Sequence, residues 1–448
     1  MGGASTINRR RVPHSMTIPA HSHIWHPYTR FSSLQADLPC IVRGEGLYLF
    51  DEHGHRYLDG VASWWSCQLG HSHPRVVQAI QAQAGTLQHS ILGNLTHPGA
   101  ETLARRLAQW MPTPDRHVMF ASDGASAVEA ALKIALQYAY QTGHTKRTRF
   151  VSLQEAYHGD TLGAVAVGYL DEFHHLLRPV LQEAWRLELP SCGACRNRDC
   201  RKPCYDGVDA FLTERADQIA GVIVEPLCLG ACGMKMYGPG YLRRLADACR
   251  RLAIPLIVDE IAMGFGRTGR WFAFEHAAID PDIVCVGKGL TAGYVPMSAA
   301  IVRDEIYRTF TDQPDDHTFY HGHTWCGNPI AAAAALAALD VYEESDLASR
   351  AAALEAVFEE RWSPLRDWPG IRAVRHLGLI GVIELEPDTE HPPKARQVQW
   401  ALREQGYLLR SLGNVIYLMP PLIIHEPELR TAAQAVADAV GTILSAKG

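Results

Sequence analysis

The chain has 448 residues, of which 47% are hydrophobic and 20% are charged, and its formal net charge at pH 7 is −6. This mix is typical of a folded globular protein and excludes a disordered chain, and the small negative charge gives no electrostatic reason to bind nucleic acid or an anionic membrane. The sequence has neither the roughly 18–20 uninterrupted apolar residues of a membrane span nor the apolar core of a secretory signal, so we expect a cytoplasmic protein that binds small molecules.

The order of the expected elements predicts an α/β fold. Residues 41–58 alternate β-like runs with turn residues, as in a meander. From about Val118 to Leu336, short β-rich runs alternate with longer helical stretches, which indicates a mostly parallel sheet covered by helices. Residues 352–448 mix helices with further β-like runs. We therefore expect three parts: an N-terminal segment (1–75), a large domain (76–340), and a C-terminal part (341–448) that forms a small domain with the N-terminal segment.

A glycine-containing turn opens a long amphipathic helix that we expect to begin near Ala127. The backbone N–H groups at such a helix N-terminus, here at Gly124 and Ala125, form a ready phosphate site, although similar turns also cap helices that bind nothing. No Gly-Lys-Ser/Thr follows, so this is not a Walker A loop, and no Gly-x-Gly-x-x-Gly dinucleotide motif is present here. The turn is therefore a candidate phosphate site that belongs to neither the Walker A type nor the dinucleotide type.

Tyr157 follows the expected strand RFVSL in a glycine-flanked loop. Its aromatic face could cover a flat ring, and the alternative is a tyrosine that simply packs in the loop.

Four cysteines are spaced C-x2-C-x4-C-x3-C in a polar insert, residues 192–204. Their thiolates could close around Zn²⁺ or an iron–sulfur cluster, and the basic side chains nearby would offset the negative charge. The spacing matches no standard zinc finger, so a redox-labile thiol loop or disulfides are alternatives. We expect a structural or regulatory metal held by Cys192, Cys195, Cys200 and Cys204.

Three apolar, β-branched runs each end in an ionisable group: GVIVE with Glu225, PLIVDE with Asp259, and DIVCVGK with Lys288. The three groups are 34 and 29 positions apart, about one βαβ unit each, so right-handed crossovers place them at the same carboxyl edge of one sheet. Ligands of open α/β sheets bind at that edge. A lone lysine there is costly unless it is paired or covalently modified.

A lysine, a carboxylate, a phosphate-binding turn and an aromatic face together fit pyridoxal 5′-phosphate. Enzymes hold this cofactor as a Schiff base to lysine, with an acid on its pyridine nitrogen. Lys288 would carry the cofactor and, once released, would act as a base because burial lowers its pKa. Asp259 would keep the ring nitrogen protonated.

The segments IVDEIAMGFGRTGR (257–270) and DIVCVGKGLTAGYVPMSA (282–299) resemble the central signature of the class III aminotransferases. The resemblance runs from about Trp25 to Pro421. It implies fold type I of the pyridoxal-phosphate enzymes: a large domain with a mostly parallel, seven-stranded sheet flanked by helices, and a small α+β domain from both chain ends. It also implies a homodimer with shared active sites.

The resemblance assigns roles to six residues of the cofactor site. Lys288, Asp259 and Tyr157 would be catalytic: the lysine carries the cofactor, the aspartate pairs with the pyridine nitrogen and the tyrosine stacks on the ring. The phosphate would be held by Gly124 and Ala125 through their backbones, and by Thr324 of the neighbouring subunit.

The motifs WHPYTR, SWW, GMKMY and VIYLMPP resemble the branch of the class that acts in biotin biosynthesis. This implies a ping-pong transfer of an amino group from S-adenosylmethionine to 8-amino-7-oxononanoate. Aromatic rings suit a sulfonium and an apolar chain, and the planar fork of arginine suits a terminal carboxylate. Without the resemblance, Trp64 and Trp65 could be core residues and Arg410 could be a solvated surface charge. The implied substrate-pocket residues are Tyr28, Trp64, Trp65, Gly322 and Arg410.

The amino donor stays open at this point. Ala125 stands where a serine often occurs in the family, and His323 replaces a proline of the best-known bacterial form. Lysine as donor for the same step, or another class III ω-amine aminotransferase, is the alternative. An aminomutase would share the lysine and aspartate but would lack WHPYTR and need no second substrate. A non-enzymatic metal-binding module is disfavoured because Lys288, Asp259 and Tyr157 are all present.

Overall fold

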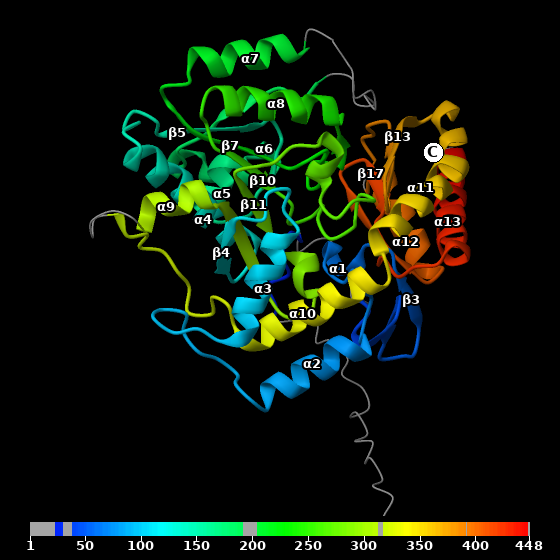
Figure 1. Cartoon of the computed structure of the whole chain (residues 1–448). Coiled ribbons are helices and arrows are strands. Elements are labelled where there is room, and N and C mark those ends of the chain that lie inside the picture. Colours follow the sequence, from blue (N-terminus) through cyan, green and yellow to red (C-terminus); the bar gives the residue numbers. More distant parts are fainter. Residues whose placement is uncertain (1–22, 30–37, 191–203, 312–316, 391, 447–448) are drawn as a thin grey trace, which may run out of the picture.

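The computed structural model describes residues 23–29, 38–190, 204–311, 317–390 and 392–446 (Figure 1). Its centre is a seven-stranded sheet in which β12 runs antiparallel to both of its neighbours and the other pairs are parallel. The predicted mostly parallel seven-stranded sheet is confirmed. The strands, in spatial order, are β4 (Arg116–Ala121), β12 (Ser298–Arg303), β11 (Ile283–Val286), β10 (Leu256–Asp259), β7 (Ile219–Val224), β5 (Arg149–Leu153) and β6 (Trp185–Leu187).

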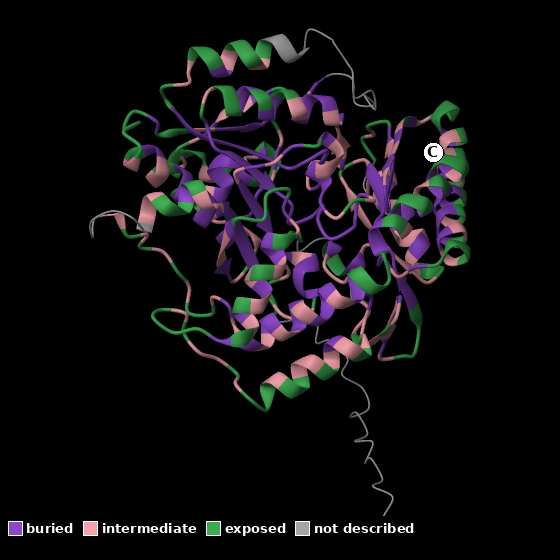
Figure 2. Cartoon of the chain, in the orientation of Figure 1, coloured by how far each residue is buried: buried purple, intermediate pink, exposed green. Residues whose placement is uncertain are grey.

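The central strands are continuous apolar runs because both faces of the sheet are covered. In β7, Val222 and Val224 belong to the cluster that includes α8 (Pro239–Arg251), whereas Ile223 belongs to the cluster that includes α4 (Gly124–Gln141). Figure 2 shows the strands buried between helices whose outer sides are exposed. A buried sheet of this kind leaves its carboxyl edge as the place where polar groups gather.

Both ends of the chain meet beside this sheet. The strands β1 (Ile41–Glu45), β2 (Tyr48–Asp51) and β3 (Arg56–Asp59) form an antiparallel meander, and β15 (Tyr407–Leu408) pairs in parallel with β3. Figure 1 shows these N-terminal strands next to the C-terminal elements. The expected packing of the two ends is confirmed. A further antiparallel sheet consists of β13 (Ile371–Leu377), β14 (Ile380–Leu385), β17 (Val415–Leu418) and β16 (Arg410–Leu412), with α11 (Leu347–Trp362), α12 (Lys394–Glu404) and α13 (Glu426–Ser445) around it.

The division into domains near residues 75 and 340 stays a prediction. Both positions lie inside helices, namely α2 (Pro74–Ala84) and α10 (Pro329–Glu344).

Among the described residues, no helix combines the length and apolar character needed to cross a bilayer. The other elements are α1 (Ala62–Trp65), α3 (Pro98–Gln109), α5 (Leu162–Val167), α6 (Asp171–His174), η2 (His175–Val180), α7 (Cys204–Glu214), β8 (Cys228–Leu229), β9 (Lys235–Met236), η3 (Ala273–Ala277), η4 (Lys288–Thr291), α9 (Asp304–Thr311) and η6 (Ser363–Asp367).

Candidate active site

Three ionisable groups meet at the carboxyl edge of the sheet, as the sequence predicts. The strands β7, β10 and β11 are neighbours and parallel, and Glu225, Asp259 and Lys288 lie at or just beyond their ends. Burial lowers the pKa of Lys288, while the negative charges of Asp259 and Glu225 nearby oppose that shift. The three groups therefore share one carboxyl edge, as expected for right-handed crossovers between parallel strands.

Lys288 is the first residue of η4 and has a left-handed backbone, with φ of 39°. Its Nζ lies 4.8 Å from the centre of the Trp65 ring. Within the part of the chain that the structure describes, its ammonium forms no hydrogen bond or ion pair. A half-buried amine in this state is suited to covalent chemistry rather than to a structural ion pair.

The carboxylate of Asp259 is held from two sides. Its Oδ2 lies 2.7 Å from Nδ1 of His158, and its Oδ1 accepts the Ile261 N–H at 3.1 Å. Nε2 of His158 is buried and has no partner among the described residues. This arrangement fixes the carboxylate in a buried place where it can face a cationic ring nitrogen. His158 is a residue that the sequence analysis did not assign to the site.

Glu225 orders the loop that carries Tyr157. Its Oε1 accepts the Tyr157 N–H and its Oε2 accepts the Gly230 N–H, both at 2.9 Å. Burial raises the pKa of Glu225 to about 7, and the nearby His158 opposes this rise. The carboxyl group therefore has a structural role in shaping the loop.

The phosphate site predicted at the start of α4 has the expected geometry. The helix begins at Gly124, three residues before the expected start at Ala127, because Asp123 caps it by accepting the Ser126 N–H at 3.0 Å. The cap leaves the first-turn N–H groups of Gly124 and Ala125 for another acceptor, at the positive end of an 18-residue helix. A Cβ at Gly124 would meet the Ile261 side chain at 3.0 Å, so glycine allows the close approach of helix and strand end.

Tyr157 lies at the edge of an aromatic wall. Its hydroxyl donates to Oδ2 of Asp160 at 2.9 Å, and the Tyr28 hydroxyl donates to the other oxygen of the same carboxylate. Burial and the bond to Asp160 raise the pKa of Tyr28 to about 12, so both phenols stay protonated. The sequence analysis did not single out Asp160. Its position three residues after Tyr157, in the same loop, is the only signal in the sequence that could have indicated it.

Trp64 and Arg410 complete the wall. The Tyr28 ring meets Trp64 edge to face at 6.0 Å and Phe173 at 5.4 Å. The guanidinium carbon of Arg410 lies 4.0 Å from the centre of the Trp64 ring, a cation–π contact. Trp65 is buried, and its indole N–H donates to the Tyr417 hydroxyl at 3.2 Å. The structure thus brings four of the five predicted pocket residues to the carboxyl edge.

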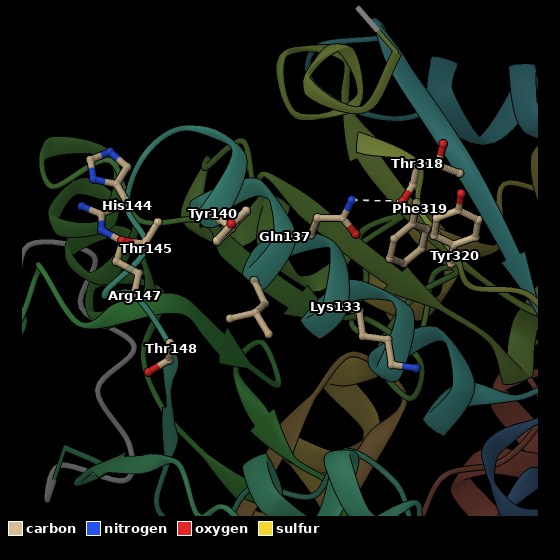
Figure 3. A pocket seen from close by; sticks show the side chains of 11 residues that line it. Lys133, Gln137, Tyr140, His144, Thr145, Arg147, Thr148, Thr318, Phe319 and Tyr320 are labelled. Carbon is tan, nitrogen blue, oxygen red and sulfur yellow. Dashed lines mark hydrogen bonds between the residues drawn. The ribbon is translucent and has the colours of Figure 1, made fainter. Parts of the chain in front are cut away.

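The fifth pocket residue, Gly322, and the predicted phosphate ligand Thr324 lie on an exposed loop. A surface hollow of about 480 Å³ lies beside this loop and α4, and Gln137 in it donates to the Thr318 carbonyl at 3.2 Å. Figure 3 shows the side chains that line this hollow. The hollow contains none of the predicted site residues. It is lined by Lys133, Leu136, Gln137, Tyr140, His144, Thr145, Arg147, Thr148, Thr318, Phe319 and Tyr320.

The predicted metal site lies outside the described residues. Cys192, Cys195 and Cys200 belong to the segment 191–203, and the side chain of Cys204 is likewise not described. That prediction stays untested.

The described groups fit pyridoxal 5′-phosphate. Within the described part of the chain, they include a lysine with no hydrogen bond or ion pair, a fixed carboxylate at its side and N–H groups at a helix N-terminus that no described group accepts. The buried Nε2 of His158, which has no hydrogen-bond partner among the described residues, adds a polar atom that a bound group could satisfy. The lysine, the carboxylate and the helix N–H groups therefore match, in turn, the carbonyl, the ring nitrogen and the phosphate of the cofactor.

Comparison with known proteins gives a consistent result. The family "Aminotransferase class-III" matches residues 32–440. The chain is 39% identical to the adenosylmethionine-8-amino-7-oxononanoate aminotransferase of Nitratidesulfovibrio vulgaris, covering 94% of this chain and 80% of that protein. It is 37% identical to the protein of the same name from Geobacter sulfurreducens, covering 94% and 96%.

Two solved structures have the same fold. One is the adenosylmethionine-8-amino-7-oxononanoate aminotransferase of Methanocaldococcus jannaschii, with 35% identity, a TM-score of 0.88 and coverage of 94% of this chain and 97% of that one. The other is a PLP-bound amine transaminase from an uncultivated Pseudomonas species, with 33% identity, a TM-score of 0.89 and coverage of 95% and 99%. The chain belongs to the class III aminotransferases, a family of pyridoxal-phosphate-dependent transaminases.

Proposed function

We propose that this protein transfers an amino group from S-adenosylmethionine to 8-amino-7-oxononanoate, a step of biotin biosynthesis. The name shared by the relatives from Nitratidesulfovibrio, Geobacter and Methanocaldococcus supports this substrate pair. The observation that carries the proposal is the wall of Tyr28, Trp64 and Arg410, because it combines aromatic faces with an arginine fork. The wall is linked to the Lys288 end of the site by Trp65, the neighbour of Trp64, whose ring centre lies 4.8 Å from the Lys288 Nζ.

Bound pyridoxal 5′-phosphate supplies an electron sink next to the reacting amine. Lys288 would attach the cofactor and, when displaced, accept and return the proton at the substrate carbon, because burial lowers its pKa. Asp259, fixed by His158 and the Ile261 N–H, would hold a negative charge opposite the ring nitrogen. Tyr157 would cover the ring, and the N–H groups of Gly124 and Ala125 would bind the phosphate. The metal that the cysteine spacing predicts is not needed for this reaction and is not part of the proposal.

The aromatic wall would receive both substrates in turn, as a ping-pong reaction requires. Arg410 would bind the terminal carboxylate of the keto acid through both oxygens. The faces of Tyr28 and Trp64 would accept the sulfonium of the donor and the apolar chain of the acceptor.

We also propose that two copies of the chain share their active sites, as the family resemblance implies. The loop that carries Thr324 exposes Tyr320 and Trp325, with 86% and 59% of their surfaces accessible. A second copy would cover these rings and receive Thr324 at its phosphate site. Light scattering should give twice the chain mass, and a fully active monomer would contradict this part of the proposal.

Replacing Arg410 by lysine should raise KM for 8-amino-7-oxononanoate about tenfold to hundredfold, because an ammonium cannot bind both carboxylate oxygens from a stacked position. Steady-state kinetics at a saturating donor concentration measure this change. Arg430→Lys is the matched control, since Arg430 pairs with Glu426 on the surface of α13. An unchanged KM in the Arg410 variant would remove the assigned carboxylate site.

The identity of the amino donor has an alternative. The structure of the amine transaminase is as similar to this chain as that of the biotin-pathway enzyme, with TM-scores of 0.89 and 0.88. Mass spectrometry of the diamine product, with S-adenosylmethionine, L-lysine or alanine offered separately, separates the two. We expect product with S-adenosylmethionine. Product only with lysine or a simple amine would move the assignment to that alternative.

A further inference from the structure

The short element α1 is a left-handed turn. Its residues Ala62, Ser63, Trp64 and Trp65 have φ values of 47°, 44°, 69° and 72°, and none of them is glycine. The turn is closed by a hydrogen bond from the Trp65 N–H to the Val61 carbonyl at 2.8 Å. Successive left-handed residues are sterically unfavourable for L-amino acids, so the surrounding structure must impose this conformation.

A buried carboxylate holds the turn. Asp59, at the end of β3, accepts the Ser63 hydroxyl at 2.7 Å through Oδ2 and the Val61 N–H at 3.3 Å through Oδ1. The same Oδ2 lies 3.0 Å from Nε2 of His71. Asp59 thus contacts both the start of the turn and the segment that follows it.

His71 is itself anchored to β1. Its backbone exchanges two hydrogen bonds with Gly46, at 2.8 and 3.0 Å. Its side chain packs so closely on Gly44 that a Cβ at that glycine would come within 2.7 Å of the His71 Cβ. The imidazole therefore has a fixed position from which it can restrain Asp59.

The turn presents two tryptophans to the two ends of the site. Trp64 supplies the face on which Arg410 stacks at 4.0 Å, and Trp65 supplies the face 4.8 Å from the Lys288 amine. A right-handed turn of the same L-residues would point both indoles in other directions. The left-handed conformation is therefore what lets one turn serve both ends.

We propose that Asp59 and His71 are positioning residues that hold this left-handed turn and so set the separation between the carboxylate-binding end and the reacting end of the substrate site. The inference rests on the proposed function, in which Arg410 and Lys288 mark those two ends. It makes the pair a determinant of the chain length that the enzyme accepts, although neither residue touches the substrate.

The charge state of the pair supports this role. Burial alone would lower the pKa of His71, but the hydrogen bond to Asp59 raises it to about 9. Burial alone would raise the pKa of Asp59, but the bonds from His71 and Ser63 lower it. The titratable groups that face His71 are Asp59 on β3 and Cys67 in the same loop, and the contact on β1 is the uncharged Gly44. A histidine with a raised pKa gives its full stabilisation below the ordinary value of 6.5 and loses it as the pH rises through about 9.

His71→Phe in the cofactor-loaded enzyme tests the proposal. We expect KM for the keto acid to rise about tenfold while kcat falls less, because a displaced binding end weakens recognition more than the chemistry. In the wild type, KM should rise above pH 9, and the variant should lose this dependence. His55→Phe is the control, since His55 pairs with Asp51 at 2.9 Å in the neighbouring hairpin, outside the site. Unchanged KM and an unchanged pH profile in the His71 variant overturn the proposal.

A glycine rescue separates positioning from general stability. Ala62→Gly in the His71→Phe background should recover part of the lost affinity, because glycine adopts positive φ freely. A lower KM in the double variant supports the role, and no recovery contradicts it. If His71→Phe does not fold, Ser63→Ala carries the same test: about a threefold higher KM supports the proposal, and an unchanged KM contradicts it.

The near-ultraviolet circular dichroism of the cofactor-loaded protein distinguishes failure of this inference from failure of the proposed function. It reports the setting of the ten tryptophans, Trp64 and Trp65 among them, whether or not the keto acid is the substrate. A changed tryptophan signal in His71→Phe, absent in His55→Phe, supports the role of the pair even if the substrate assignment is wrong. An unchanged signal contradicts it.

Discussion

Lys288→Ala should abolish turnover, by about 10⁴-fold or more, and leave the fold intact. The variant loses both the group that attaches the cofactor and the base that moves the proton. Its stability should not fall, because the Lys288 ammonium is desolvated and forms no ion pair within the described residues.

Three measurements check this result: the rate of product formation, the visible absorption of the lysine-bound cofactor and the thermal unfolding of the protein. Lys394→Ala at the start of α12 is the control for the loss of a lysine, since its ion pair with Glu390 is partly exposed. Retained turnover in the Lys288 variant would contradict the assignment of the active site.

The second large effect is expected for Asp259→Asn, which should lower kcat/KM on the order of 10²- to 10³-fold. A neutral amide cannot stabilise a protonated ring nitrogen. It also replaces one acceptor of the His158 contact at 2.7 Å or of the Ile261 N–H at 3.1 Å with a donor. The effect should therefore combine lost charge with altered orientation.

Steady-state kinetics and titration with pyridoxal 5′-phosphate measure this effect. Asp438→Asn, in an exposed hydrogen bond to Gln434 on α13, is the control. A rate within twofold of the wild type would show that no ring nitrogen faces Asp259.

The parallel direction of the central strands and the shared edge of their polar ends could be predicted from the sequence because they depend on local properties. Runs of β-branched residues separated by one βαβ unit fix which ends share an edge, and this placed Glu225, Asp259 and Lys288 correctly. The predicted start of α4 near Ala127 is three residues too late, because Asp123 caps the helix and the Gly124 turn is its first turn.

Contacts between distant segments could not be predicted in this way. His158 meets Asp259 across 101 positions, and Trp65 meets Tyr417 across 352. The left-handed turn carries no glycine that would indicate it, because tertiary contacts from Asp59 and His71 impose it. The role of Thr324 depends on a second subunit, so that assignment stays a prediction from the family resemblance.

The half-reaction without a keto acid tests the central claim most directly. The purified protein is loaded with pyridoxal 5′-phosphate, and S-adenosylmethionine is then added alone while the visible spectrum is followed. The account predicts an absorption band of lysine-bound cofactor that the amine converts to the pyridoxamine form, and that Lys288→Ala lacks. A wild-type protein that forms no such band would contradict the assignment of Lys288 and, with it, the proposed chemistry.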